Sequence, residues 1–311
     1  MSTPAIETYS TQTFRERYMR PEQKLDVLLK PDFGSFFIVP VEEMIRLVKL
    51  PVPPTRATNH LLLYLTEGEA QMRIGSESYR IVQEECLVVP AGQVFSFAQA
   101  DVNRGYLCSF GPDFLAGTFG PREALRAFEF LQVWGRHCLP LGPAAGGYAG
   151  RLLERMHAAY AGQGLRDPYL LRSYLAALLC EIRTVYQLPA TDKPQRAVTL
   201  TNGFKELLFA EVRTRQRVGE YAEVLHVTPN HLNKAVKGVT GKSPSRWIDE
   251  TLVLEAKVLL HQTDLSVGEV AAALGLFDPS YFARLFRKYA GVTPVAFRKK
   301  IEKSQDRLFS S

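Results

Sequence analysis

The feature that most constrains this chain is a segment that occurs twice in its C-terminal third. "YAEVLHVTPNHLNKAVKGVTGKSPSRW" (221–247) aligns with "VAAALGLFDPSYFARLFRKYAGVTPVAF" (270–297), and the offset of 49 residues becomes 50 where the second turn gains one residue. The matched positions include Ala222 with Ala271, Pro229 with Pro279, and Gly241 with Gly291. A repeat of this length predicts two copies of one supersecondary unit.

Each copy has the pattern of a helix-turn-helix, which we expect at about 218–238 and 267–289. The first helix of each copy ends at a tight turn, which holds His226 in one copy and Gly275 in the other. The second helix begins with a capping residue followed by proline, in "TPNH" and in "DPSY". Its apolar positions would face inward and its polar positions outward, which suits a helix that enters a DNA major groove.

The polar positions of the second helices are the candidate DNA contacts. They are Asn230, His231, Asn233, Lys234 and Lys237 in the first copy, and Ser280, Tyr281, Arg284, Arg287 and Lys288 in the second. Lys242, Ser243, Arg246 and Thr293, near the starts of the following helices, join them. The basic side chains can reach a phosphate or a guanine edge. The hydroxyls of Ser243 and Thr293 suit a phosphate, although helix capping explains both residues equally well.

The helix expected between the two copies, roughly Pro244–Thr263, has a length that matters for DNA binding. About 20 residues at ~1.5 Å each give a helix of roughly 30 Å. Successive major grooves on one side of B-DNA are about 34 Å apart. A helix of this length can therefore hold two recognition helices one turn of DNA apart.

The charge of the chain is concentrated in the same region. Residues 193–311 hold 19 Lys and Arg against 12 Asp and Glu, while residues 1–192 hold 19 against 20, so that +7 and −1 give the total of +6. A basic region beside a nearly neutral one is typical of a polyanion-binding module. A solvated basic surface would have the same charge, and a general nucleoid protein would bind DNA with little sequence preference.

The N-terminal half has a different pattern, with short apolar runs separated by turn residues. We expect strands at 35–40, 60–68, 69–75, 78–82, 86–92, 94–98 and 106–110, with hairpin turns at "TEGEA" and "IGSES". From about 121 to 188 the apolar spacing is helical. The predicted division is a polar, partly mobile arm (1–30), a strand-rich barrel (31–120), a helical region (121–188), a linker (189–198) and a DNA-binding domain (199–302).

The second copy, "VAAALGLFDPSYFARLFRKYAGVTPVAFR", resembles the signature of the AraC/XylS family of bacterial transcription regulators, and the likeness extends over about 200–300. It implies a seven-helix domain whose two units read major grooves of double-stranded DNA. The segment "LLLYLTEGEAQMRIGSESYRIVQEECLVVPAG" is similar to the family's cupin-like sensor barrel. The resemblance thus implies an α+β protein, an activator with a small-molecule effector in its barrel, that forms a homodimer and contacts RNA polymerase.

The residues that would hold an effector or form the dimer are less clearly indicated. Aromatic residues on predicted barrel strands, with one arginine, are the candidate effector contacts: Phe36, Tyr64, Arg73, Phe95, Phe97 and Tyr106. Plain core packing explains the aromatic residues too, and Arg73 would suggest an anionic effector only if it pointed inward. Apolar residues at helical spacing are candidates for the dimer interface or for the core of one subunit: Leu152, Met156, Leu171, Leu175 and Leu178.

Catalysis is not expected. His60 is the only histidine in residues 1–136, so the barrel lacks the His and carboxylate cluster of a metal cupin, and we expect neither a metal nor a cofactor. The alternatives are a cupin enzyme with an accessory DNA-binding module, or a regulator whose barrel serves only dimerisation or protein contacts. Four separated cysteines, no signal peptide and no apolar run of bilayer length predict a cytoplasmic protein.

Overall fold

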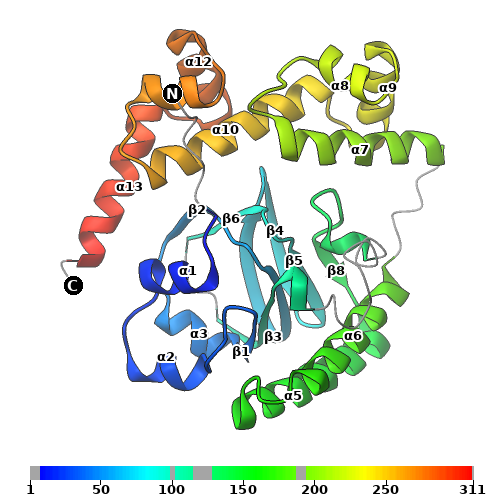
Figure 1. Cartoon of the computed structure of the whole chain (residues 1–311), viewed down its shortest axis with the longest axis vertical. Coiled ribbons are helices and arrows are strands. Elements are labelled where there is room, and N and C mark those ends of the chain that lie inside the picture. Colours follow the sequence, from blue (N-terminus) through cyan, green and yellow to red (C-terminus); the bar gives the residue numbers. More distant parts are fainter. Residues whose placement is uncertain (1–7, 99–101, 115–127, 187–193, 310–311) are drawn as a thin grey trace. The chain divides into compact units, whose positions relative to one another are not determined.

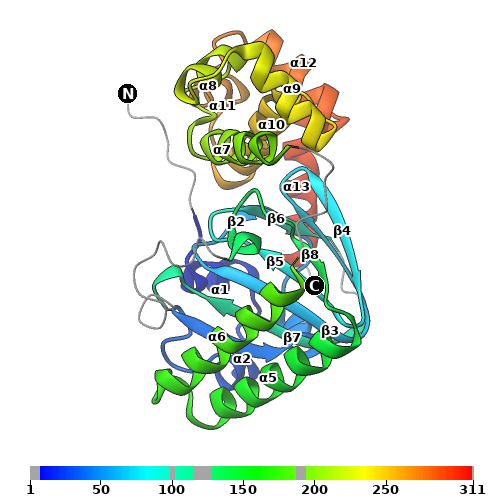
Figure 2. The same cartoon turned by 90° about the vertical axis from the view of Figure 1, so that its right-hand side faces the viewer.

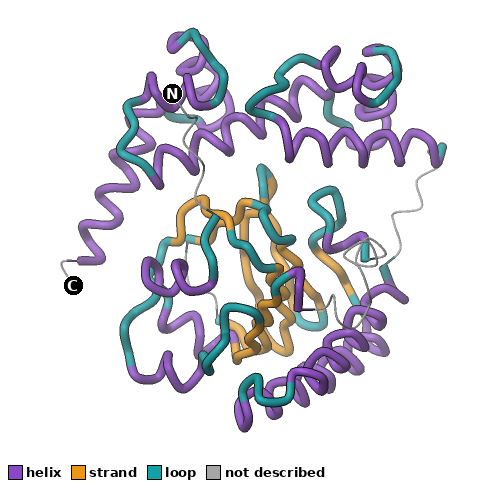
Figure 3. Tube along the Cα trace, viewed as in Figure 1, coloured by secondary structure: helices purple, strands orange, loops and turns teal. Residues whose placement is uncertain are grey.

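The structure, a computed structural model, describes residues 8–98, 102–114, 128–186 and 194–309. The chain divides into two compact units, of which one is Thr8–Leu188 and the other contains Pro189–Ser311. Every strand among the described residues belongs to the first unit, and the second unit consists of helices and loops (Figure 3). The predicted α+β fold, a cupin-like strand-rich domain followed by an all-α domain, is therefore confirmed.

The first unit is built on an antiparallel sheet of eight strands among the described residues. They are β1 (Phe36–Pro40), β2 (Val52–Arg56), β3 (His60–Ile74), β4 (Glu77–Val82), β5 (Glu85–Val89), β6 (Val94–Phe97), β7 (Asn103–Phe110) and β8 (Cys138–Pro140). The main path runs β1-β7-β3-β5-β8, while β4 and β6 pair with the second half of β3, and β2 pairs with β6 (Figure 1).

The long strand β3 replaces two strands and a hairpin that the sequence predicted, so the turn expected at "TEGEA" is wrong. The pairing of β3 with β7 shifts register between Leu65 and Glu67. Gly68 follows with a φ of +78°, and a Cβ built there would lie 2.2 Å from the carbonyl oxygen of Val102. The glycine therefore marks a bulge at which β3 passes from its pairing with β5 and β7 to its pairing with β4 and β6. The turn predicted at "IGSES" is confirmed.

Helices cover the sheet of the first unit. They are α1 (Thr11–Tyr18), α2 (Gln23–Leu28), α3 (Val41–Leu47), α5 (Gly142–Gln163) and α6 (Pro168–Val185), with a 3-10 turn at Glu129–Leu131. The two long helices α5 and α6 pack side by side and share one apolar core with β1 (Figure 2). Asp167 accepts a hydrogen bond from the backbone N–H of Tyr169, which confirms its predicted role as the cap of α6.

The mobile arm predicted at 1–30 is wrong for the residues that the structure describes. The first two helices are part of the first unit, and five apolar or aromatic side chains from this segment are buried: Tyr9, Tyr18, Met19, Leu25 and Leu29. The polar composition concealed them because they are widely spaced in the sequence. Residues 1–7 lie outside the described residues.

The second unit contains seven helices among the described residues. They are α7 (Gln195–Glu211), α8 (Val218–Val224), α9 (Pro229–Thr240), α10 (Pro244–Gln262), α11 (Val267–Ala273), α12 (Pro279–Ala290) and α13 (Pro294–Phe309). Helix α10 connects the α8–α9 pair to the α11–α12 pair (Figure 1). The linker predicted at 189–198 is too long at its C-terminal end, because α7 already begins at Gln195; residues 189–193 lie outside the described residues.

Candidate DNA-binding surface and ligand cavity

The second helices of the two repeats, α9 and α12, have the same construction. Each has 12 residues, begins with proline after a side-chain cap, and ends at a glycine in the left-handed region. The cap of α9 is Thr228, whose hydroxyl accepts from the N–H of His231, and the cap of α12 is Asp278, whose carboxylate accepts from the N–H of Ser280. The apolar positions of both helices are buried: Leu232, Ala235, Val236, Phe282, Leu285 and Phe286.

The opposite face of each helix carries the residues that the sequence proposed as DNA contacts. All five on α9 and all five on α12 are exposed: Asn230, His231, Asn233, Lys234, Lys237, Ser280, Tyr281, Arg284, Arg287 and Lys288. The structure thus separates the two faces as expected. Exposed basic and amide side chains on a capped helix suit phosphate and base contacts. Contact of these residues with DNA stays a prediction.

The four supporting residues have local roles of their own. The hydroxyl of Ser243 accepts from the N–H of Arg246 and caps α10, while the hydroxyl of Thr293 accepts from the N–H of Ala296 at the start of α13. Capping therefore accounts for both hydroxyls. A backbone N–H at such a helix start can still meet a phosphate, because the dipole of the helix favours an anion there.

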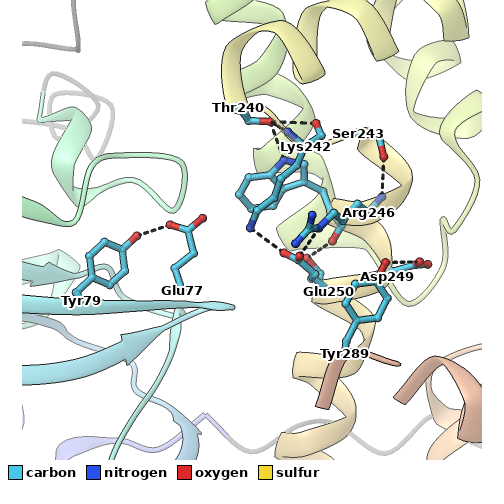
Figure 4. Close-up of polar contacts among 11 residues, drawn as sticks. Glu77, Tyr79, Thr240, Lys242, Ser243, Arg246, Asp249, Glu250 and Tyr289 are labelled. Carbon is cyan, nitrogen blue, oxygen red and sulfur yellow. Dashed lines mark hydrogen bonds and ion pairs between the residues drawn. The ribbon is translucent and has the colours of Figure 1, made fainter. Parts of the chain in front are cut away.

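Lys242 and Arg246 converge on a buried carboxylate that the sequence analysis missed (Figure 4). Glu250 is only 8% exposed, and its two oxygens lie 3.0 Å from Nζ of Lys242 and 2.8 Å from Nε of Arg246. The carboxylate fixes both cations at the start of α10 and neutralises part of their charge. Its spacing of four residues from Arg246 was the available signal, since side chains at i and i+4 meet on a helix.

Trp247 extends this cluster across three helices. Its Nε1 donates a hydrogen bond to the hydroxyl of Thr240, over 3.1 Å, at the end of α9. The ammonium groups of Lys205 on α7 and Lys242 lie 4.8 and 5.0 Å from the ring centroid. These cation–π contacts tie the first repeat to α7 and α10. Its counterpart in the second repeat, Phe297, instead packs on Phe286 with ring centroids 5.5 Å apart.

The first unit contains a cavity of about 120 Å³ inside the sheet. It is lined by Thr11, Phe14, Met19, Phe37, Val41, Met44, Ile45, Val48, Ala57, Asn59, Leu61, Leu63, Ala70, Gln71, Met72, Phe95, Phe97, Asn103, Leu107 and Ser109. Most of these side chains are apolar. Helices α1 and α3 supply one side of the cavity, and strands β1, β3, β6 and β7 supply the other.

Only two of the six predicted effector contacts, Phe95 and Phe97, line this cavity. The choice of the other aromatic residues is wrong, because successive side chains of a strand point to opposite faces. The neighbours Phe37, Leu63 and Leu107 line the cavity in place of Phe36, Tyr64 and Tyr106.

The opposite face of the sheet accounts for the three aromatic residues. The ring of Phe36 lies 5.8 Å from that of Tyr160, the hydroxyl of Tyr64 donates to the carbonyl of Gly146, and the ring of Tyr106 lies 5.7 Å from that of His157. All three partners belong to α5. Arg73 is exposed and does not line the cavity, so it gives no support to an anionic effector.

Two family descriptions match the chain over most of its length. Residues 221–300 match a helix-turn-helix domain, and residues 51–179 match an AraC-like ligand binding domain. These two matches occur in the order that the family resemblance implied. The chain belongs to the AraC family of transcriptional regulators.

Known proteins resemble this AraC-family regulator at modest identity. The MmsAB operon regulatory protein of Pseudomonas aeruginosa is 28% identical over 261 residues, which are 80% of this chain and 78% of that protein. The bifunctional transcriptional activator/DNA repair enzyme AdaA of Bacillus subtilis is 33% identical over 78 residues, 25% of this chain and 37% of its own. The crystal structure of ToxT from Vibrio cholerae aligns with a TM-score of 0.42 and 11% identity over 86% of this chain and 98% of that chain.

As an AraC-family transcriptional regulator, the protein is not an enzyme. The described residues contain no group of three or more His, Cys, Asp or Glu side chains placed to hold a metal ion. The single histidine of the predicted barrel, His60, accepts from the N–H of Ala91 and stacks on Phe110. Burial lowers the pKa of His60 to about 4, so the ring is neutral and structural. In the described part of the chain, no helix has the length and apolarity to cross a bilayer.

The helical residues proposed for the dimer interface of this regulator belong instead to the core of one subunit. Met156, Leu171, Leu175 and Leu178 are at most 1% exposed and pack between α5, α6 and the sheet. A side chain that is already buried in its own chain has no surface to offer to a partner. Leu152 is partly exposed and remains available.

Proposed function

We propose that this AraC-family regulator is a sequence-specific transcriptional activator controlled by a small molecule that binds in the apolar cavity of its first unit. The observation that carries the DNA-reading part is the matched construction of α9 and α12. Two helices of equal length, with the same caps, present exposed polar and basic faces from one helical unit. The relative named a transcriptional activator, AdaA, matches this same region and favours activation over repression.

The length of α10 supports reading of two successive major grooves. Its 19 residues span roughly 28 Å at ~1.5 Å each, close to the distance of about 34 Å between such grooves. In this arrangement Lys234 and Lys237 of α9 and Arg284 and Arg287 of α12 approach the DNA from the same side. The supporting contacts would come from the starts of α10 and α13, where Ser243 and Thr293 expose free helical N–H groups.

The test of DNA reading starts from a pool of random double-stranded DNA, from which the full-length protein selects its preferred sites. Fluorescence anisotropy then compares a selected site with a scrambled one at a fixed salt concentration. We expect an affinity ratio on the order of 10³ and two protected segments about one helical turn apart. A ratio near one would indicate a general nucleoid protein and would reject the proposal.

The effector part of the proposal is tested separately by transcription from a promoter that contains the selected site. We expect transcription to rise when a ligand of the cavity is added, and a variant with a filled cavity to lose this response while it still binds DNA. A regulator whose first unit serves only dimerisation or protein contacts would be unaffected by both changes. The homodimer and the contact with RNA polymerase stay predictions, and a dimer would have to use exposed residues of the first unit.

A further inference from the structure

The chemistry of the cavity wall limits the effector that can bind there. Among the described residues that line the cavity, none is Asp, Glu, Lys, Arg, His or Tyr. The nearest candidate cations lie elsewhere, since Arg73 is exposed and Arg80 forms an ion pair with Glu69 on the outer surface. A carboxylate or an ammonium group would therefore be buried without an opposite charge, which is strongly unfavourable.

The polar groups of the wall are of two kinds. At one end, Asn59 is satisfied within the protein, because its Nδ2 donates to Thr11 Oγ1, the carbonyl of Gly34 and Ser109 Oγ at 3.0–3.3 Å. Its Oδ1 accepts a hydrogen bond from the hydroxyl of Thr58. A ligand group that approached Asn59 would have to compete with these bonds.

Asn103, at the start of β7, is different. Its Nδ2 donates to the carbonyl oxygen of Glu69 over 2.9 Å, which fixes the orientation of the side-chain amide, because a carbonyl can only accept. Its Oδ1 is buried and has no hydrogen-bond partner among the described residues. Asn103 pairs with Gly68 at the bulge of β3, so this acceptor belongs to the bulged end of the cavity. A buried acceptor of this kind is satisfied when a ligand brings a donor.

The size of the cavity sets the third limit. An apolar cavity of about 150 Å³ accommodates a benzene ring, and this cavity measures about 120 Å³. Met19, Met44 and Met72 are in the wall, and their flexible thioether side chains can adapt to a ring or a branched chain. The cavity therefore fits one ring or a short branched chain.

We propose that the effector is a small uncharged molecule, apolar except for one hydroxyl group, of the class of phenols and short branched alcohols, and that its hydroxyl donates a hydrogen bond to Oδ1 of Asn103. This inference rests on the proposed function in that it takes the cavity to be the effector site. It distinguishes such a hydroxyl compound from a carboxylic acid and from a sugar, whose many hydroxyl groups would be left without partners by the apolar wall.

The test uses three probes of one shape with the full-length protein: 4-methylphenol, toluene and 4-methylbenzoate. Isothermal titration calorimetry near neutral pH measures their binding. We expect 4-methylphenol to bind, toluene to bind about tenfold more weakly because it lacks the donor, and 4-methylbenzoate to show no binding. If the carboxylate binds as well as the phenol, if toluene matches the phenol, or if none of the three binds, the proposal is overturned.

Variants locate the interaction. Asn103→Leu should reduce the affinity for 4-methylphenol to that for toluene and leave toluene unchanged, whereas a general loss of structure would weaken both equally and overturn the assignment. Asn103→Ala repeats the measurement if the leucine variant does not fold. Ala70→Leu, or Leu107→Phe as a milder change, should fill the cavity and abolish binding of both compounds. Tyr106→Phe is the matched control, because its side chain lies on the opposite face of β7.

DNA binding separates this proposal from the proposed function. If 4-methylphenol binds with the expected preferences but leaves promoter binding and transcription unchanged, the ligand class stands and control by the cavity fails. If instead a carboxylate binds in the cavity and alters transcription, control by the cavity stands and the ligand class fails.

Discussion

The two helix-turn-helix units have the same helix lengths and caps, yet they are stabilised by different means. In the second unit, Phe282, Phe286 and Phe297 pack in sequence, with ring centroids 5.9 and 5.5 Å apart. In the first unit the corresponding residues are Leu232, Val236 and Trp247. The first unit depends more on neighbouring helices, because Phe204 of α7 packs edge-on against Tyr221, with centroids 5.3 Å apart.

The polar clusters differ in the same way. The first unit has Glu250 between Lys242 and Arg246 at the start of α10. At the aligned positions of the second unit stand Lys300, Val292 and Ala296, which cannot form such a cluster. The outward face of α12 is correspondingly richer in arginine than that of α9. The comparison indicates that one repeat was adapted for a well-packed, basic reading helix and the other for integration with the rest of the domain.

The largest expected effect is on the aromatic core of the second unit. Phe282→Ala should lower the free energy of unfolding by about 3–5 kcal/mol, because it removes a buried ring from between α11, α12 and α13. Urea unfolding followed by circular dichroism measures the change. Leu232→Ala in the first unit is the matched variant, and we expect a smaller loss of about 2–3 kcal/mol. Equal losses would contradict the view that the two cores differ.

The agreement between sequence and structure was closest in these repeats. The inward and outward positions of α9 and α12 could be assigned from spacing alone, since caps, glycines and apolar residues all gave the same answer. Glu250 was missed because a charged residue is rarely buried, and only its two cationic neighbours make that burial favourable.

In the first unit the sequence predicted the strands but not the faces of the strands. Alternation placed Phe95 and Phe97 on one side, but the direction of that side depends on pairing with distant strands. Phe37 and Leu61 both pair with Ser109, for example, and all three residues line the cavity. Such long-range register carries no local signal. The bulge at Gly68 was mistaken for a hairpin for the same reason.

The second prediction compares the reading faces of the two units. Arg284 and Lys234 occupy equivalent exposed positions. Arg284→Ala should weaken binding to the selected site by about 1–3 kcal/mol if its guanidinium contacts a base edge. Lys234→Ala should cost less and act alike on all sequences if its ammonium contacts a phosphate, and it should reduce the salt dependence by about one ion. Anisotropy titrations over a series of salt concentrations distinguish the two. An unchanged affinity of the arginine variant would show that Arg284 does not contact DNA.

The third prediction concerns the turn of the second unit. Gly275 has a φ of +75°, and a Cβ built there would lie 2.8 Å from the carbonyl oxygen of Arg213. Gln216 also donates a hydrogen bond to the carbonyl of Leu274 in this turn. Gly275→Ala should therefore destabilise the protein by about 1–2 kcal/mol, from the left-handed backbone together with the close contact. Urea unfolding provides the measurement, with Gly268→Ala as a control, because Gly268 has open space around it. A loss no larger than that of the control would contradict the close packing of this turn.

The smallest effect is expected at the equivalent turn of the first unit, where the sign should reverse. His226 adopts a φ of +54° and is exposed, so its side chain gives no packing in return for the strained backbone. Replacing it by glycine removes the contact of Cβ with the backbone but adds freedom to the unfolded chain. These terms oppose each other, and His226→Gly should raise the free energy of unfolding by less than about 1 kcal/mol. His226→Ala retains Cβ and should give no increase, which isolates the backbone effect. If glycine destabilises this turn, then His226 makes a contact that stabilises the first unit, and the two turns are more alike than their exposure indicates.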